Sequence, residues 1–264
     1  MENEKKHIIQ TTNLSIGYAD KKTVNTIASN LNIELGKGSL VCLLGKNGIG
    51  KSTLLRTLTK VQPALNGEVY INNQNLDTLN NLELSKSLSL VLTERLPESN
   101  LSVFEIVALG RQPYTNWVGS LTDKDLNFIN EALEQTNIKH LSNSKYYELS
   151  DGQLQKVLIA RTLAQNTDII ILDEPTAHLD IHHTIETFTL LKKLAENFNK
   201  TIIVSTHEIN LALQLANELW LMTPSNFVAG KTDELIKKDQ LNKLFDSDLI
   251  QFNKTLKQFT INHS

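Results

Sequence analysis

The segment Gly45 to Ser52 reads Gly-Lys-Asn-Gly-Ile-Gly-Lys-Ser and lies between a strand-like apolar run, residues 39–44, and a helical pattern, residues 51–60. Glycines in such a turn let backbone N–H groups approach an anion closely, and the helix N-terminus adds positive potential. The spacing G-x-x-x-x-G-K-[ST] in this context predicts a phosphate-binding loop. A glycine turn beside a surface lysine is the alternative.

This loop defines the first group of candidate site residues. The loop backbone is expected to surround the phosphates of a nucleotide, with Lys51 reaching the β- and γ-phosphates and Ser52 binding Mg²⁺. Thr53 adds a hydroxyl at the same helix start. The predicted nucleotide-binding residues of the loop are Gly45, Asn47, Gly48, Gly50, Lys51, Ser52 and Thr53.

Two adjacent acids, Asp173 and Glu174, follow the apolar run Ile169-Ile170-Ile171-Leu172. Such a run is typical of a parallel strand buried on both faces, and open α/β sheets bind ligands at the carboxyl ends of their strands. We therefore expect Asp173 to bind Mg²⁺ and Glu174 to act as general base toward water attacking the γ-phosphate. A strand-end acid pair that caps the next helix is the alternative.

A histidine, His207, follows a further strand-like run at residues 201–205. If that strand is parallel to its neighbours, His207 lies at the same edge of the sheet and can donate a hydrogen bond to the γ-phosphate. Histidines after strands are more often structural, and this second interpretation remains open on the residue alone.

Strand-like and helical segments alternate along most of the chain, which predicts an α/β fold with a mostly parallel sheet and helices on both faces. Residues 8–44 read as strands and turns, and residues 101–164 are rich in helical patterns. Thr122 begins a capping box, T-D-K-D. The residues from Lys231 onward carry weaker helical patterns.

The composition is that of an ordinary soluble protein. The 264 residues are 40% hydrophobic and 21% charged, with a net charge of -3, which argues against a nucleic-acid-binding protein. The single cysteine, Cys42, is expected in the core. No apolar stretch approaches the roughly 20 residues that span a bilayer, and the N-terminus lacks a signal-peptide pattern.

Residues 149–153, Leu-Ser-Asp-Gly-Gln, resemble the LSGGQ signature of ATP-binding cassette (ABC) ATPases. From about residue 13 to residue 230 the motifs occur in that family's order: phosphate loop, signature, Asp173-Glu174, a D-loop at residues 177–180, and His207 as switch histidine. The resemblance implies a P-loop NTPase core with an N-terminal antiparallel β region and an inserted helical subdomain. The implied boundaries are about 7–92 and 167–230 for the core and β region, 95–165 for the helical subdomain, and 231–264 for the tail.

The same resemblance implies an ATPase that uses ATP and Mg²⁺ and works as a pair of identical chains. In that arrangement Tyr18 stacks on adenine, although a half-buried strand aromatic is the alternative. Ser150, Gly152 and Gln153 contact nucleotide held by the neighbouring chain, and Asp180 lies in the D-loop.

Two residues depart from the family pattern. Asp151 replaces the second residue after Leu149, usually glycine, and is expected to point away from the phosphates as a helix N-terminal acid. Glu94 replaces the usual glutamine of the Q-loop, and we expect it to face or bind Mg²⁺.

Residues 103–114, which include Gly110-Arg111-Gln112-Pro113, resemble the importer branch for iron–siderophore, haem or cobalamin ligands. This branch implies integral-membrane permease subunits, an extracytoplasmic substrate-binding protein, a peripheral location on the cytoplasmic face of the inner membrane, and no nucleic-acid partner. Alternatives are a soluble cassette acting on ribosomes or DNA, an ATPase of another transporter branch, and a non-hydrolysing regulatory cassette.

Overall fold

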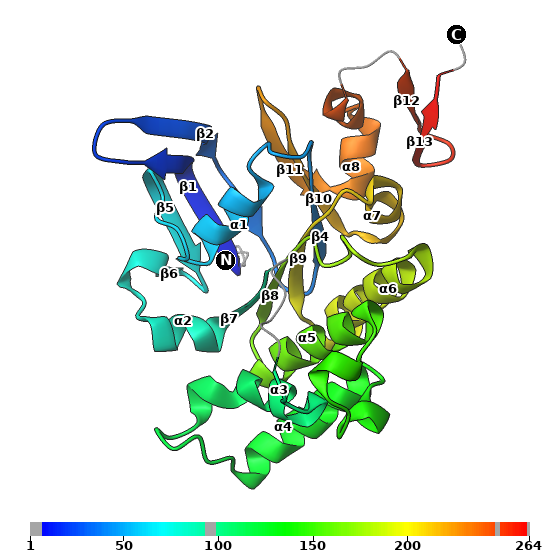
Figure 1. The fold of residues 1–264 in the computed structure, drawn as a ribbon. Helices are drawn as coiled ribbons and strands as arrows, with labels where there is room; N and C mark the ends of the chain where they lie inside the picture. Colours follow the sequence, from blue (N-terminus) through cyan, green and yellow to red (C-terminus); the bar gives the residue numbers. More distant parts are fainter. Residues whose placement is uncertain (1–6, 93–98, 246–248, 263–264) are drawn as a thin grey trace, which may run out of the picture.

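The computed structural model describes residues 7–92, 99–245 and 249–262. A six-stranded sheet runs through the centre of the molecule in the order β11-β10-β4-β9-β8-β7 (Figure 1). Its neighbouring strands are parallel except for β10 and β11. The strands are β4 Leu40–Leu44, β7 Leu88–Val91, β8 Ile169–Asp173, β9 Thr201–Ser205, β10 Glu218–Met222 and β11 Phe227–Lys231.

Strand β4 explains why the sheet needs cover on both faces, since each of its residues is fully buried. Cys42 and Leu44 pack into one hydrophobic cluster, which also holds Leu191 of helix α6 Ile181–Phe198. Leu43 packs into the other cluster, beside Leu54 of helix α1 Lys51–Leu58. The predicted core position of Cys42 is confirmed.

A second, antiparallel sheet is built from the N-terminal part of the chain (Figure 1). Strand β1 is its centre and pairs with β2, β3 and β5. The strands are β1 Ile9–Ala19, β2 Val24–Leu31, β3 Glu34–Leu35, β5 Asn66–Ile71 and β6 Gln74–Asn75. The predicted α/β fold, with a mostly parallel sheet and an N-terminal antiparallel region, is confirmed.

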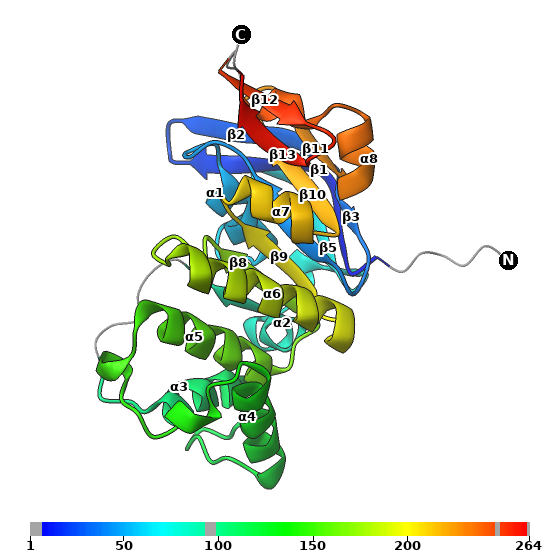
Figure 2. The ribbon, with the colours of Figure 1, turned by 90° about the vertical axis from the view of Figure 1, so that its right-hand side faces the viewer.

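Helices cover both sheets, and a further group lies beyond one end of the central sheet. Helices α6 and α7 Ile209–Leu215 cover one face of that sheet (Figure 2). Helices α3, α4 and α5 pack on one another at the lower end of the molecule in both views (Figures 1 and 2). The remaining bounds are α2 Asn81–Ser87, α3 Val103–Ala108, α4 Asp123–Gln135, α5 Asp151–Gln165 and α8 Thr232–Lys237.

A buried ion pair fastens α4 to this group. Arg111, in the 3₁₀ turn after α3, donates from Nε to Oδ1 of Asp125 at 2.8 Å and from Nη1 to the carbonyl oxygen of Ala164 at 2.7 Å. Asp125 also closes the capping box predicted at Thr122, whose N–H donates to Oδ2 of Asp125 at 2.9 Å. The segment with Gly110-Arg111 therefore has a structural role between α4 and α5.

The C-terminal residues differ from the expected helical patterns. Beyond α8 the chain forms a hairpin of β12 Ile250–Asn253 and β13 Gln258–Ile261. The ring of Phe259 lies 5.0 Å from the ring of Phe245 and 5.3 Å from that of Phe252, measured between centroids. Aromatic packing stabilises this hairpin. The sequence predicted weak helical patterns in this region and no hairpin.

Candidate nucleotide-binding site

The loop at residues 45–50 joins β4 to α1, as the sequence predicts. Gly50 has a φ of 111° and a Cβ there would lie 2.3 Å from Cγ2 of Ile27. A Cβ on Gly45 would lie 2.5 Å from the carbonyl oxygen of Met222. A side chain at Gly45 or Gly50 would therefore collide with its neighbours, which explains why glycine occupies these two positions.

The side chain of Lys51 is buried, with 4% of its surface exposed. Its Nζ donates to the carbonyl oxygen of Gly45 at 3.1 Å and lies 3.4 Å from Oε1 of Glu174. A buried ammonium needs such partners, because desolvation disfavours the charged form. The lysine of the loop and the acid after β8 therefore meet, although they lie 123 positions apart in the sequence.

Strand β9 brings the two predicted acids into a fixed arrangement, because it lies between β4 and β8. The hydroxyl of Ser205 donates to Oδ1 of Asp173 at 2.6 Å. The N–H of Glu174 donates to Oγ of Ser205 at 2.9 Å and to its carbonyl oxygen at 3.1 Å. Glu174 itself has a φ of 46°, a conformation that costs energy for an L-residue and is concentrated at functional sites.

Ser205 was not among the candidate site residues that the sequence motifs indicated. Its signal is a polar residue at the carboxyl end of a run of β-branched residues, Ile202-Ile203-Val204. In a parallel sheet that position lies at the ligand-binding edge.

A pocket of about 410 Å³ opens over the loop, within the 300–1,000 Å³ range of small-molecule sites. Its lining includes seven of the predicted nucleotide-binding residues: Tyr18, Asn47, Gly48, Gly50, Lys51, Ser52 and Thr53. Ile27 and Glu174, the predicted base, line it as well. Tyr18 is 52% exposed, and its hydroxyl lies 3.1 Å from Oγ1 of Thr53. The pocket thus brings the aromatic ring of Tyr18 together with the loop residues that the sequence predicts to bind phosphate.

The oxygen donors at this edge suit a hard divalent cation. Ser52 lines the pocket beside Glu174, and Asp173 ends the strand whose next residue is Glu174. Hydroxyl and carboxylate oxygens are the ligands that Mg²⁺ prefers. The third predicted ligand, Glu94, lies outside the described residues.

The signature residues lie apart from this pocket. Ser150 caps α5, because its Oγ accepts from the N–H of Gln153 at 3.3 Å while Oε1 of Gln153 accepts from the N–H of Ser150 at 2.9 Å. Asp180 is the N-cap of α6, where its Oδ1 accepts from the N–H of His183 at 2.8 Å. Among the described residues, Ser150, Gly152, Gln153 and Asp180 do not line the pocket over the loop.

Asp151 and His207 are not part of the lining of the pocket over the loop. Asp151 is exposed in the first turn of α5 and lines a neighbouring cavity that Glu174 also lines. His207 follows β9 by two residues and its Nε2 lies 3.6 Å from Oε1 of Glu208. Within the described ranges, the pocket over the loop is lined without His207.

None of the helices in the described ranges combines the length and the apolarity needed to cross a bilayer.

Comparison with known proteins agrees with this geometry. The family described as ABC transporter matches residues 28–177. The chain is 35% identical to the achromobactin transport ATP-binding protein CbrD of Dickeya dadantii, over 91% of this chain and 88% of that protein. It is 33% identical to the iron(3+)-hydroxamate import ATP-binding protein FhuC of Bacillus subtilis, again over 91% and 88%.

A solved structure is similar over most of its length. It is a dimeric ATP-binding cassette in a post-hydrolysis state bound to ADP and phosphate, with a TM-score of 0.72, 29% identity, and coverage of 85% of this chain and 98% of that one. With the phosphate loop, the strand-end acids and these relatives together, the chain belongs to the ABC transporter family, as an ATP-binding subunit that hydrolyses ATP to ADP and phosphate.

Proposed function

We propose that this chain powers the import of a ferric siderophore through a membrane permease, and that two copies act together with two ATP molecules between them. The observation that carries the catalytic part is the meeting of Lys51 and Glu174, 3.4 Å apart, at the base of a pocket that Tyr18 borders. The cargo class rests on the names of the similar proteins, achromobactin and iron(3+)-hydroxamate transporters.

In this proposal each residue of the pocket has one task. Tyr18 stacks on the adenine, and Lys51 with the loop N–H groups binds the β- and γ-phosphates. Ser52 and Asp173 hold Mg²⁺, which supplies charge neutralisation on the phosphate oxygens when bound. Glu174 accepts the proton of the attacking water. Ser205 keeps the carboxylate of Asp173 and the backbone of Glu174 in register.

The remaining candidate residues act between the two copies. Ser150, Gly152 and Gln153 of one chain contact the nucleotide held by the other, and Asp180 lies at the same interface. His207 reaches the γ-phosphate after the pair closes, which requires its ring to leave Glu208. Glu94 faces the Mg²⁺ in that closed pair.

The helices at about residues 95–165 form the subdomain that transmits the closing and opening of the pair to the permease. The pair is then peripheral on the cytoplasmic face of the membrane, and the permease receives cargo from an extracytoplasmic substrate-binding protein. Haem and cobalamin are the other cargoes that the 103–114 segment allows.

Glu174→Gln tests the catalytic proposal. Removing the base is expected to lower turnover by about a hundredfold or more while ATP still binds, so an ATP-bound dimer accumulates on size-exclusion chromatography. Glu196→Gln is the matched control, because Glu196 lies on the exposed side of α6. A Glu174→Gln chain that hydrolyses ATP at the normal rate removes Glu174 from the role of base.

Uptake of radioactive iron by cells that carry or lack this chain tests the cargo. Uptake of ferric hydroxamate that depends on the chain supports the proposal, whereas uptake of only haem or only cobalamin contradicts it.

A further inference from the structure

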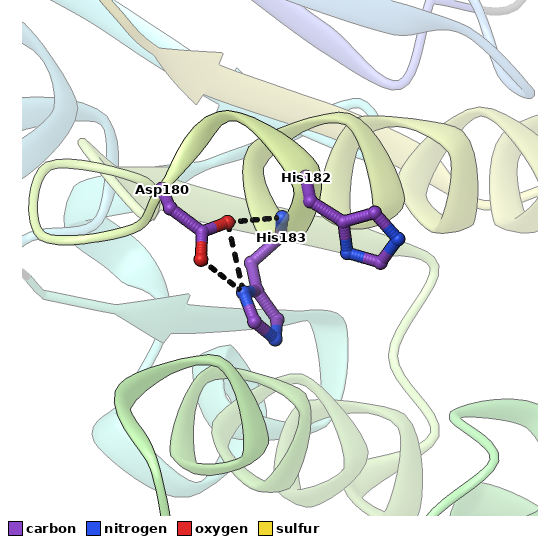
Figure 3. A group of neighbouring side chains, drawn as sticks. All are labelled: Asp180, His182 and His183. Atoms are coloured by element: carbon purple, nitrogen blue, oxygen red, sulfur yellow. Dashed lines mark hydrogen bonds and ion pairs between the residues drawn. The ribbon is translucent and has the colours of Figure 1, made fainter.

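A histidine of α6, His183, contacts two of the predicted interface segments at once. On one side its Nδ1 lies 2.9 Å from both carboxylate oxygens of Asp180 (Figure 3). On the other side its ring lies against Gly152, where an added Cβ would be 2.3 Å from Cδ2 and 2.9 Å from Nε2. The imidazole thus fills the space between Asp180 and the first turn of α5.

The hydrogen-bond roles in this contact follow from the state of Asp180. Hydrogen bonds from the backbone and the ring of His183 hold the pKa of Asp180 below its usual range, so the carboxylate is ionised and accepts. Nδ1 of His183 is therefore the donor, and the opposite edge of the ring, with Cδ2 and Nε2, faces α5.

A second contact joins the same two helices one turn further along. Nζ of Lys156 lies 3.0 Å from Oε2 of Glu186. Lys156 follows Gly152 by four residues and Glu186 follows His183 by three, so each pair shares one helix face. Helices α5 and α6 are therefore joined at two successive levels.

The neighbouring histidine does not take part in the contact with Asp180 and Gly152. The side chain of His182 is 76% exposed and hydrogen-bonds neither Asp180 nor α5: its ring meets the ring of His183 edge-on, with 5.5 Å between the centroids, and its Nδ1 lies 3.9 Å from Oε2 of Glu186. His182 therefore provides a matched control for His183, being of the same residue type and adjacent on the same helix.

The joined segments come from different parts of the fold. Helix α5 packs with α3 and α4, whereas α6 packs on strands β4 and β9 of the central sheet. Asp180 follows Glu174 by six residues, and Gly152 lies in the signature segment. A side chain that holds both fixes the signature segment relative to the loop that leaves the catalytic acid.

We propose that His183 is a positioning residue that holds residues 177–180 and residues 150–153 as one rigid surface for the second copy of the chain. This inference rests on the proposed pairing around ATP. Losing the Nδ1 hydrogen bond lets the two segments move independently, so ATP-driven association weakens while ATP binding to the single chain is unchanged.

Two amide substitutions separate this role from simple packing. In His183→Asn the amide nitrogen occupies the place of Nδ1 and can still donate to Asp180. In His183→Gln it lies nearer the place of Nε2, toward α5, and the bond to Asp180 is lost. Both side chains are neutral and polar, and thermal melting shows whether either variant, or His183→Ala, is unfolded.

The experiment measures two quantities for the full chain: the dissociation constant of a fluorescent ATP analogue at protein concentrations too low for pairing, and the protein concentration at which specific ATPase activity is half-maximal. For His183→Gln and His183→Ala the second quantity is expected to rise about threefold to fivefold, the effect of losing one solvent-exposed charged hydrogen bond, with the first unchanged. His183→Asn and His182→Ala stay within about twofold of the wild type.

The proposal is overturned if His183→Asn and His183→Gln reach half-maximal specific ATPase activity at the same protein concentration. It is also overturned if this concentration is the same for His183→Gln as for the wild type. If His183→Ala is unfolded, the Asn and Gln pair decides. A wild-type chain whose specific activity does not change with concentration contradicts the pairing itself, which is a separate failure of the proposed function.

Discussion

The hydroxyl of Ser205 donates to Oδ1 of Asp173 at 2.6 Å, and Oγ of Ser205 accepts a hydrogen bond from the N–H of Glu174 at 2.9 Å. One side chain on β9 thereby holds two consecutive acids at the end of β8. Because Ser205 is fully buried, water cannot replace either hydrogen bond when the side chain is shortened.

Ser205→Ala is expected to raise the Mg²⁺ concentration for half-maximal ATPase activity and to lower turnover, each by about tenfold, since one hydrogen bond to a charged group is lost. Ser89→Ala is the matched control: Ser89 is also buried in the central sheet, on β7, where Oγ1 of Thr167 donates to it at 3.0 Å. A Mg²⁺ titration of both variants checks this. Equal Mg²⁺ dependence of Ser205→Ala and the wild type removes the positioning role of Ser205.

Tyr18→Ala is expected to weaken ATP binding about fivefold, because a stacking aromatic ring contributes about 1 kcal/mol. Tyr18→Phe loses only the contact between the hydroxyl and Thr53, so its affinity stays near that of the wild type. Tyr147→Ala, at an exposed ring in the turn before α5, controls for the loss of a surface tyrosine. Titration with a fluorescent ATP analogue measures all three, and unchanged affinity in Tyr18→Ala would leave Tyr18 as a strand residue without contact to the base.

Acid is expected to destabilise the contact between Arg111 and Asp125. Hydrogen bonds from the side chain and the backbone of Thr122, followed by the one from Arg111, lower the pKa of Asp125 from its ordinary value. A carboxylate with a lowered folded-state pKa stabilises the fold above the unfolded-state pKa of about 4, and that stabilisation is lost as pH falls through the folded-state pKa. Asp125→Asn therefore costs about 2 kcal/mol at neutral pH and progressively less as the pH falls below about 4.

Urea unfolding at several pH values measures this difference. Asp123→Asn is the control, because Asp123 lies exposed in the same first turn of α4 and shares the helix dipole without the ion pair. If the free energy of unfolding of Asp125→Asn differs from that of the wild type by the same amount at every pH, the stabilisation does not come from the ionised carboxylate of Asp125.

The sequence predicted the elements whose signals are local. The phosphate loop and the capping box at Thr122 each depend on a few consecutive residues. The alternation of apolar runs and helical patterns predicted the parallel sheet, because buried strands such as β8 are continuously apolar.

Contacts between distant segments were not predictable in the same way. Such contacts depend on how strands and helices pack. Examples are the hydrogen bonds between Ser205 and Asp173 and between Arg111 and Asp125, and the packing of His183 on Gly152. The hairpin β12–β13 was missed because its strands are four residues each, too short for a periodic pattern.

Mixing two inactive variants tests whether each ATP lies between Lys51 of one chain and Ser150 of another. Lys51→Ala removes the phosphate-binding amine, and Ser150→Arg obstructs the surface that meets the second chain. Each variant alone is expected to be inactive, because every pair then has two defective sites.

A mixture in equal amounts contains about one half mixed pairs, and each mixed pair keeps one complete site of two when the sites are shared across a twofold axis. We therefore expect recovery of up to about one quarter of the wild-type ATPase rate. ATPase activity of the mixture that stays at the level of the separate variants would contradict it, because Lys51 and Ser150 would then serve the nucleotide of their own chain.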